Sequence, residues 1–224
     1  MRFPLPVKAV TIDLDGTLLD TIPDLAAAAN DMLKELGRSP IDVALIRTFV
    51  GKGIPRLVEK TLDAAGVVDA RDREPALAIF ERHYELINGR HTTVFPGVVE
   101  ALGELKAQRF PLACLTNKSA KFTMPLLEAA GLASYFEHVV AGDTLPVKKP
   151  HPAPLLHTSQ AFKIAPRDML MIGDSVNDTQ AARAAGCLIF CVTYGYNEGR
   201  DVRELDTDAV VDSLVEAVRL IEKA

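Results

Sequence analysis

Short apolar runs recur along this chain, and helical patterns separate most of them. The runs cover residues 7–14, 111–115, 139–141, 169–172, 188–192 and 209–211. The helical patterns between them cover residues 98–108, 120–130, 153–162 and 179–185. Strands that alternate with helices predict a parallel sheet, and near-continuous apolar strands indicate burial on both faces. We therefore expect an α/β fold, with a Rossmann-like parallel sheet core and helices on both faces.

One region of the chain contains only helical patterns. Apolar residues recur at helical spacing over residues 22–36, 54–65 and 73–87. Gly37 supplies a stop signal, and Pro96-Gly97 marks a boundary where the chain returns to alternating strands and helices. This predicts an all-helical domain at residues 18–92, inserted after the first strand of a core made of residues 1–17 and 93–224.

Charge and composition narrow the classes of function. The net charge of -5 gives no general attraction to nucleic acid, so an anionic ligand needs a local site. No apolar stretch approaches the length of about 18 residues that a membrane span needs, and the N-terminus lacks the apolar region of a signal peptide. The three cysteines, Cys114, Cys187 and Cys191, have no metal-ligand spacing. We expect a reduced, cytoplasmic protein with structural cysteines, either a monomer or a homodimer.

Two acids follow the first apolar run directly, in the sequence Asp13-Leu14-Asp15-Gly16-Thr17. Carboxylates two residues apart on an extended chain point to the same side. The carboxyl end of a parallel strand is where α/β folds bind ligands, and two acids there repel each other unless a cation or a shared proton relieves them. One acid is suited to nucleophilic attack and metal binding, and the other to proton transfer. A solvated turn is the alternative interpretation.

Polar residues also follow three later strands. Thr116 and Asn117 offer a hydroxyl and an amide to a phosphate oxygen, although a helix N-cap explains them equally well. Lys149 precedes Pro150, which stiffens the chain, while the adjacent Lys148 is expected to be solvated. A solvated charge is the alternative for Lys149.

The last of these strands runs into Gly173-Asp174-Ser175-Val176-Asn177-Asp178. Asp174 and Asp178 are four residues apart where a helix begins, so they can share one face and suit a hard cation such as Mg²⁺. Helix capping by Asp or Ser is the alternative, but it explains one acid and not two.

With these four pieces in order, the chain resembles the haloacid dehalogenase-like superfamily, and the helical insertion resembles its first type of cap domain. The resemblance implies that Asp13 forms an aspartyl-phosphate and that Asp15 acts as acid and then as base. It implies that Mg²⁺ is bound by Asp13, Asp174 and the main-chain carbonyl of Asp15, and that Asp178 orients this metal site.

The resemblance also implies that Thr116, Asn117 and Lys149 hold phosphoryl oxygens. Within the superfamily, segments such as TFVGKGIPRLVEKTL, LTNKSAKF and VTYGYNEG resemble the phosphoglycolate phosphatases. The implied activity is Mg²⁺-dependent hydrolysis of a small phosphate monoester, most specifically 2-phosphoglycolate, to glycolate and phosphate.

Selectivity for the leaving group is expected from the cap. The flexible loop Gly51-Lys52-Gly53 can bring backbone N–H groups and one cation over the site, and Arg56 is a second candidate cation. These four residues are the substrate-binding candidates in the cap, with Lys52 the preferred contact for a carboxylate.

Other functions share parts of this pattern. A sugar phosphomutase has the same motifs and is distinguished by its product, and a pyrophosphatase or nucleotidase is a second enzyme alternative. A carbon–halogen hydrolase is disfavoured because it does not need the acid at Asp15. A phosphate-binding regulatory module without catalysis is disfavoured because Asp13, Asp15 and Lys149 are all present.

Overall fold

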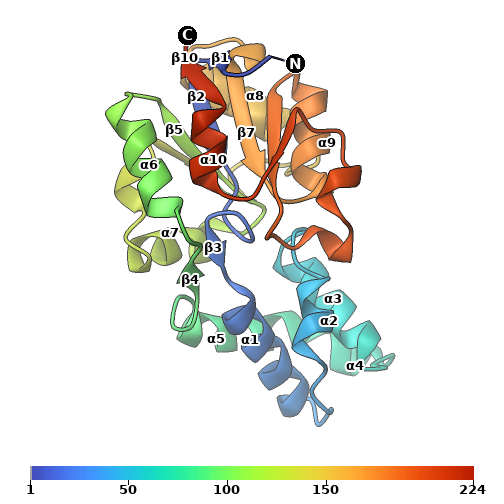
Figure 1. The fold of residues 1–224 in the computed structure, drawn as a ribbon. Helices are drawn as coiled ribbons and strands as arrows, with labels where there is room; N and C mark the ends of the chain where they lie inside the picture. The colour runs from blue at the N-terminus through green and yellow to red at the C-terminus, as the bar shows by residue number, and fades with distance from the viewer. Residues whose placement is uncertain (1) are drawn as a thin grey trace.

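The computed structural model describes residues 2–224 and contains a six-stranded parallel sheet (Figure 1). The strand order is β6-β5-β2-β7-β8-β9, and every pair of neighbours is parallel. The strands are β2 (Ala9–Ile12), β5 (Leu112–Leu115), β6 (His138–Val140), β7 (Met169–Gly173), β8 (Leu188–Val192) and β9 (Ala209–Val211). The expected parallel α/β fold is confirmed.

Helices cover both faces of this sheet because its strands alternate their side chains between two apolar layers. Leu170 and Ile172 of β7 pack in one core with α6 (Val98–Ala107), α7 (Ala120–Ala129) and α10 (Leu214–Arg219). Met169 and Met171 of the same strand face the opposite core. That second core contains residues of α8 (Ala153–Ala161) and α9 (Val176–Ala185).

The first apolar run is two strands rather than the single strand that the sequence suggested. β1 (Leu5–Val7) pairs with β10 (Ile221–Lys223) in a separate two-stranded sheet, and only β2 enters the main sheet. Lys8 separates the two strands, with its backbone N–H donating to the carbonyl of Asp168 and its side chain paired with the Asp168 carboxylate. Four short 3₁₀ helices lie in core loops, at Ala133–Tyr135, Pro166–Asp168, Asn197–Gly199 and Val202–Glu204.

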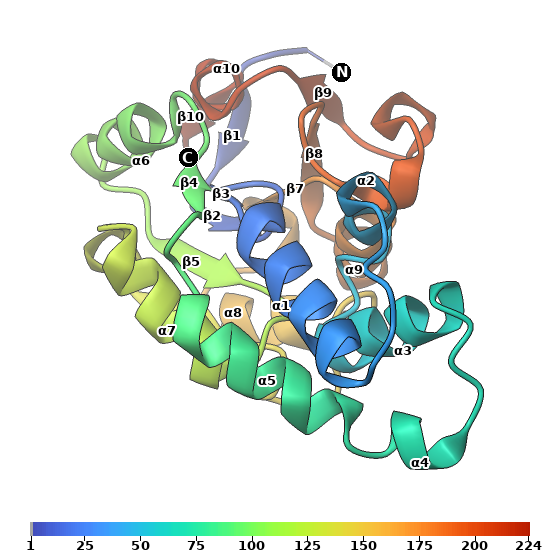
Figure 2. The ribbon, with the colours of Figure 1, turned by 90° about the horizontal axis from the view of Figure 1, so that it is seen from below.

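The helical insertion after β2 forms a body of its own below the sheet (Figure 1). Its helices are α1 (Ile22–Glu35), α2 (Val43–Arg47), α3 (Ile54–Ala64), α4 (Ala70–Arg73) and α5 (Ala76–Ile87). The helix expected over residues 73–87 begins later, at Ala76, because Pro75 lacks the backbone N–H that would continue the helix from α4, which ends at Arg73. Figure 2 shows α1, α3 and α5 lying across the end of the sheet.

The two connections between the insertion and the core are tied together. β3 (Leu19–Asp20) and β4 (Thr93–Val94) pair antiparallel, so the outgoing and returning chains run side by side. Next to them the fully buried Asp24 carboxylate accepts hydrogen bonds from the backbone N–H groups of Gly89, His91 and Thr92. The insertion is therefore attached to the core through a structured pair of linkers.

Two core aromatic residues extend into the apolar cluster of the insertion. Phe122 of α7 and Tyr196, in the loop after β8, pack with buried residues of α1, α2, α3 and α5.

Within residues 2–224, no helix is both long and apolar enough to cross a membrane.

Candidate active site

The polar residues singled out in the sequence meet at the carboxyl end of the sheet. Asp13 follows the central strand β2, Thr116 follows β5 and Asp174 follows β7, and these three strands are adjacent. Strand order reverses at β2, and such a switch point is where open α/β sheets bind ligands. The insertion lies across this edge (Figure 2).

Lys149 joins two of the acids. Its Nζ lies 2.8 Å from Asp13 Oδ1 and 2.7 Å from Asp178 Oδ1, and it also donates to the carbonyl oxygen of Leu115 at 2.8 Å. The side chains of Lys149 and Asp178 are almost completely buried. Burial disfavours the ammonium, but the carboxylates of Asp13 and Asp178 outweigh that cost and raise the pKa of Lys149 above its ordinary value. Lys149 is therefore a permanent cation beside Asp13.

Asp178 has both of its carboxylate oxygens engaged by the protein. Oδ1 accepts from Lys149, while Oδ2 accepts from the Ser175 hydroxyl at 2.7 Å and from the Ser175 backbone N–H at 3.1 Å. Ser175 and Asp178 form a capping box at the start of α9, which explains why this helix begins three residues before the expected position 179. The capping interpretation is thus correct for Asp178 and leaves Asp174 to be explained.

Asp174 is held from two sides. Its Oδ2 accepts from the backbone N–H of Tyr196 at 2.6 Å, and its Oδ1 lies 3.4 Å from the Thr17 hydroxyl. Gly16, at φ +89°, lies so close that a Cβ there would be 2.4 Å from Asp174 Oδ2. A Cβ on Gly195 would be 2.1 Å from the Asp174 Cβ. Both glycines are therefore required by the close approach of backbone to this carboxylate.

The donors at this end of the sheet fit a divalent cation. Carboxylate oxygens of Asp13, Asp174 and Asp178 lie within 4.8 Å of one another. Together with the ammonium of Lys149 they carry a formal charge of 3 − 1 = 2 negative units. Burial, followed by the nearby charge of Asp178, raises the pKa of Asp174 to about 7. A hard cation would relieve this repulsion, and all-oxygen donors suit Mg²⁺.

The pKa of Asp13 is also raised well above its ordinary value. Burial is the largest cause, Lys149 opposes it, and the charges of Asp178 and Asp174 add to it. The acid is therefore destabilised in its ionised form unless another cation joins Lys149.

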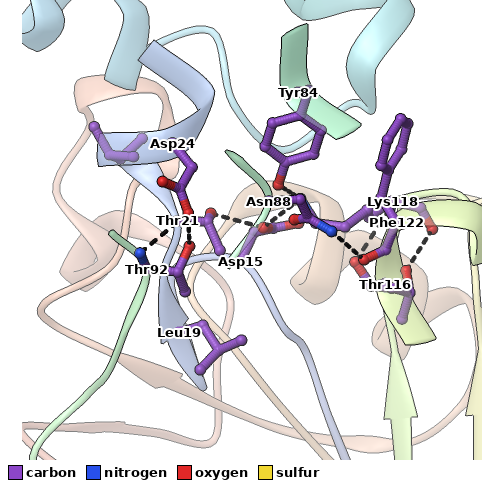
Figure 3. Close-up of polar contacts among 12 residues, drawn as sticks. Asp15, Leu19, Thr21, Asp24, Tyr84, Asn88, Thr92, Thr116, Lys118 and Phe122 are labelled. Atoms are coloured by element: carbon purple, nitrogen blue, oxygen red, sulfur yellow. Dashed lines mark hydrogen bonds and ion pairs between the residues drawn. The ribbon is translucent and has the colours of Figure 1, made fainter. Parts of the chain in front are cut away.

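Asp15 pairs with a lysine that the sequence analysis did not assign to the site. Lys118 Nζ lies 2.9 Å from Asp15 Oδ1, and the same oxygen accepts from the Thr21 hydroxyl at 2.7 Å. Lys118 also donates to the hydroxyl of Tyr84, on α5, at 2.9 Å. Figure 3 shows the lysine side chain reaching both partners, with Tyr84 coming from the insertion.

A cavity lies between the core and the insertion. Its polar floor comes from the core, and its roof comes from the insertion. The floor residues are Asp13, Asp15, Thr116, Asn117 and Lys118, and the roof residues are Leu25, Val50, Gly51, Gly53, Ile54 and Leu57. Since four roof side chains are aliphatic, the charged groups of the site face an apolar cover.

Thr116 and Asn117 both line this cavity, but the side-chain amide of Asn117 is already in use. Its Nδ2 donates to the carbonyl oxygens of Gly51 at 2.8 Å and Lys149 at 2.9 Å, while its Oδ1 is buried without a partner. Asn177 Nδ2 reaches the same Gly51 carbonyl at 3.4 Å. In this conformation Asn117 fastens the insertion to the core instead of offering its N–H donors to a ligand.

The cap candidates divide into two groups. Gly51 and Gly53 line the cavity, whereas Lys52 and Arg56 do not. Lys52 Nζ lies 2.5 Å from Glu198 Oε1, and Arg56 is paired with Glu59 on the surface of α3. The structure therefore does not bring the two candidate cations to the other site residues.

Lys148, expected to be solvated, is only partly exposed. A Cβ built on Gly53 would lie 2.8 Å from Lys148 Nζ, so this lysine lies against the loop of the insertion.

The residues missed by the sequence analysis share a cause. Lys118 and Tyr196 stand in the segments LTNKSAKF and VTYGYNEG, so only resemblance drew attention to them. Tyr84 lies in an ordinary amphipathic helix, where an aromatic residue is expected in the core. No spacing pattern could have paired Tyr84 with Lys118, because the pairing depends on how α5 packs against the core.

The arrangement is suited to nucleophilic substitution at a phosphorus atom. A carboxylate, a permanent ammonium and donors for a divalent cation surround Asp13, while Asp15 is placed to exchange a proton in the same cavity. Positive charge fixed where a transferring phosphoryl group gains negative charge is the main requirement for this chemistry.

Comparison with known proteins agrees with this geometry. The family model for haloacid dehalogenase-like hydrolases matches residues 7–186. The chain is 57% identical to the phosphoglycolate phosphatase of Nitrosospira multiformis over 100% of both chains. It is 54% identical to the phosphoglycolate phosphatase of Thiobacillus denitrificans over 99% of both chains.

A solved structure has the same fold over nearly the whole chain. A crystal structure described as a predicted phosphoglycolate phosphatase from Haemophilus somnus superposes with a TM-score of 0.91 at 33% identity. The match covers 95% of this chain and 96% of that chain, so it includes both the sheet and the helical insertion.

Proposed function

The chain belongs to the haloacid dehalogenase-like hydrolase family, and from this premise we propose that it is a Mg²⁺-dependent phosphatase that hydrolyses 2-phosphoglycolate to glycolate and phosphate. The observation that carries the proposal is the placement of Asp13 and Asp15 on the floor of one cavity, each paired with a buried lysine. The choice of phosphoglycolate as the substrate is supported by full-length similarity to proteins named phosphoglycolate phosphatases.

Asp13 is the proposed nucleophile. Its carboxylate attacks phosphorus and forms an aspartyl-phosphate. The Lys149 ammonium, 2.8 Å away, favours the ionised form of Asp13 and donates to the phosphoryl oxygens. Thr116, also on the cavity floor, is placed to donate its hydroxyl to a phosphoryl oxygen. The buried position of Lys149 makes its charge effective because little water is present to screen it.

Asp15 is the proposed acid and base. It gives a proton to the leaving ester oxygen and later takes one from the water that hydrolyses the aspartyl-phosphate. The Thr21 hydroxyl and the Lys118 ammonium hold its Oδ1, so the carboxyl group keeps a fixed orientation in the cavity.

Mg²⁺ is proposed to be held by Asp13, Asp174 and the main-chain carbonyl of Asp15, with Asp178 orienting the site through Lys149 and Ser175. When bound, the ion neutralises charge on the phosphoryl group and on the acids. Asp174 is kept in place by Tyr196, whose backbone N–H donates to it.

We assign the role of a closing cap to residues 18–92, with the core formed by residues 1–17 and 93–224. The support is the apolar roof over the cavity, which would exclude bulk water during phosphoryl transfer.

We also propose a cytoplasmic location, for which the three buried free cysteines are the support.

The test is a measurement of phosphate release from a panel of phosphate esters and diphosphates, with product analysis. Phosphoglycolate should give the highest kcat/KM, with free glycolate and phosphate as products, and activity should vanish in chelator and return with Mg²⁺. A phosphorylated isomer as product would instead indicate a sugar phosphomutase. Preference for a diphosphate or a nucleotide, or full activity after exhaustive chelation, would contradict the proposal.

A further inference from the structure

The cavity contains one cationic side chain beside the reacting acids. Of the residues that line it, only Lys118 carries an ammonium or guanidinium group. Lys149 is buried beside Asp13, Lys148 lies against Gly53 and is not among the lining residues, and Lys52 and Arg56 are paired elsewhere. A negatively charged leaving group that enters this cavity therefore meets Lys118.

The position of Lys118 is strongly constrained. Its backbone N–H donates to the Thr116 hydroxyl at 3.1 Å, and its carbonyl oxygen accepts from the backbone N–H of Gly142 at 2.8 Å. Its ammonium is held between Asp15 and Tyr84, each 2.9 Å away. A lysine ammonium has three N–H donors, and these two contacts use two of them. The third donor has no protein partner among the described residues, and Lys118 is one of the residues that line the cavity.

The dimensions of a glycolate leaving group match this arrangement. In phosphoglycolate a single carbon separates the ester oxygen from the carboxyl carbon. The acid that protonates the ester oxygen must come within about 3 Å of it. Lys118 Nζ lies 2.9 Å from Asp15 Oδ1, so a carboxylate on the adjoining carbon falls next to this ammonium. A cation on the rim of the insertion, such as Lys52, is not beside Asp15.

We propose that Lys118 and the Tyr84 hydroxyl form a carboxylate subsite, which selects phosphate monoesters that carry a carboxylate on the carbon next to the ester oxygen. This inference rests on the proposed phosphatase function and adds the residues that recognise its substrate. Lys118 supplies the charge, and Tyr84 fixes the ammonium between Asp15 and the leaving group. The cation, Lys118, thus comes from the core, and the insertion contributes the hydroxyl of Tyr84.

The subsite is complete only when α5 lies on the core. Tyr84 belongs to the apolar cluster of the insertion and contacts Phe122 of α7, with ring centroids 4.9 Å apart. Asn88, at the end of α5, donates to the Phe122 carbonyl at 2.9 Å (Figure 3). Docking of α5 therefore places the hydroxyl that positions Lys118, so cap closure and recognition of the carboxylate use the same contact.

The test measures binding without chemistry, because Lys118 also touches Asp15. The probes are 3-phosphonopropanoate, a non-hydrolysable mimic of phosphoglycolate, and propylphosphonate, in which a methyl group replaces the carboxylate. Isothermal titration calorimetry with the Mg²⁺-loaded protein should show that wild type binds the carboxylate probe at least about tenfold more tightly, the value of one charge-assisted hydrogen bond. In Lys118→Met this ratio should fall to near one, while the affinity for propylphosphonate stays within about threefold.

Further variants keep the test decisive if Lys118→Met does not fold. Tyr84→Phe should lower the ratio by about threefold or more, because it removes one neutral partner of the ammonium. Lys118→Arg should restore part of the ratio, because it restores the positive charge. Lys52→Ala is the matched control and should leave the ratio unchanged.

The outcomes separate this inference from the proposed function. If wild type does not discriminate between the probes, or if Lys118→Met keeps the preference, the subsite is wrong even when phosphoglycolate is hydrolysed. If wild type releases no phosphate from phosphoglycolate, the proposed function is wrong whatever the probes show.

Discussion

The two buried lysines of the site, Lys149 and Lys118, invite comparison because each pairs with one acid of the Asp13-Leu14-Asp15 turn. Lys149 is held by core groups: Asp13, Asp178 and the Leu115 carbonyl. Lys118 is held by Asp15 from the core and by Tyr84 from the insertion. The first pair is complete without the insertion, and the second is not.

This difference separates two tasks. In the proposed function, transfer of the phosphoryl group is the same for every ester, and its cation, Lys149, is held by core groups alone. Recognition of the leaving group differs between esters, and the cation proposed for it, Lys118, takes its second partner, Tyr84, from the insertion. Binding energy from the leaving group can then be used to assemble the closed site.

The change with the largest expected effect is Asp13→Asn, which removes the proposed nucleophile beside Lys149. Steady-state turnover of every ester should fall by about four orders of magnitude or more. Phosphate release by purified variant, free of wild type and of deamidated protein, provides the measurement. Asp15→Asn is the matched change beside Lys118, and with an activated aryl phosphate it should still form a phosphorylated enzyme that mass spectrometry detects. Ordinary turnover by Asp13→Asn would refute the assignment of the nucleophile.

Removing the two lysines should also affect stability unequally. Lys149→Met leaves Asp13 and Asp178 buried without their cation, which costs about 3–5 kcal/mol of the free energy of unfolding. Lys118→Met should cost less, because it leaves one carboxylate without its cation instead of two, and Asp15 keeps its hydrogen bond from Thr21.

Urea denaturation in the presence of chelator measures the free energy of unfolding of both lysine variants. Lys148→Met, next to Lys149, is the control and should change the free energy of unfolding by less than about 0.5 kcal/mol. Equal losses for Lys149→Met and Lys118→Met would contradict the comparison.

The acids around Lys149 predict a pH dependence of the metal-free protein. The pKa of Asp174 is about 7 in the folded state and 3.8 ordinarily, and the pKa of Asp13 is raised as well. Between these values the folded state binds more protons than the unfolded state, so stability is greatest at low pH and falls as pH rises. From pH 5 to 7 the loss should be about 2 kcal/mol.

Thermal unfolding in chelator across this pH range checks the prediction. Mg²⁺ should reduce the loss, since it favours the ionised acids, and Asp174→Asn should also reduce it. Rising stability between pH 5 and 7 in chelator would show that the acids are not destabilised by burial.

The smallest effect is expected at Lys52, the cation that the sequence favoured for the carboxylate. Lys52 does not line the cavity, and its ammonium is paired with Glu198 in a partly exposed ion pair that contributes at most about 1 kcal/mol to stability. Lys52→Ala should therefore keep kcat/KM for phosphoglycolate within about threefold of wild type, in contrast to the tenfold loss or more that the sequence interpretation implies. Steady-state kinetics with phosphoglycolate and an aryl phosphate distinguish these two expectations. A loss of kcat/KM on phosphoglycolate alone would indicate that Lys52 contacts the substrate carboxylate.

Much of the fold follows from local patterns. The apolar runs at 169–172, 188–192 and 209–211 are strands at almost the expected bounds, because a strand buried on both faces needs an uninterrupted apolar segment. The division of the first run depended on pairing, since β1 joins β10 from the far end of the chain. The apolar pattern of a segment does not specify which strand it will pair with.

The sequence by itself determined where the candidate site lies. Asp13, Thr116 and Asp174 each follow a strand, and parallel strands bring their carboxyl ends to one edge whatever the detailed packing. Their meeting therefore required only the right order of strands and helices.

The tertiary structure alone decided which cation serves each acid. Lys118 is separated by 34 residues from Tyr84, and Tyr196 by 22 residues from the Asp174 carboxylate that its backbone holds. Lys52 has the flexible glycine-flanked setting that suggested a ligand contact, but its side chain pairs with Glu198 instead. Such contacts depend on how the helical insertion packs on the sheet. That packing comes from the shape and burial of many side chains at once, so no short segment encodes it.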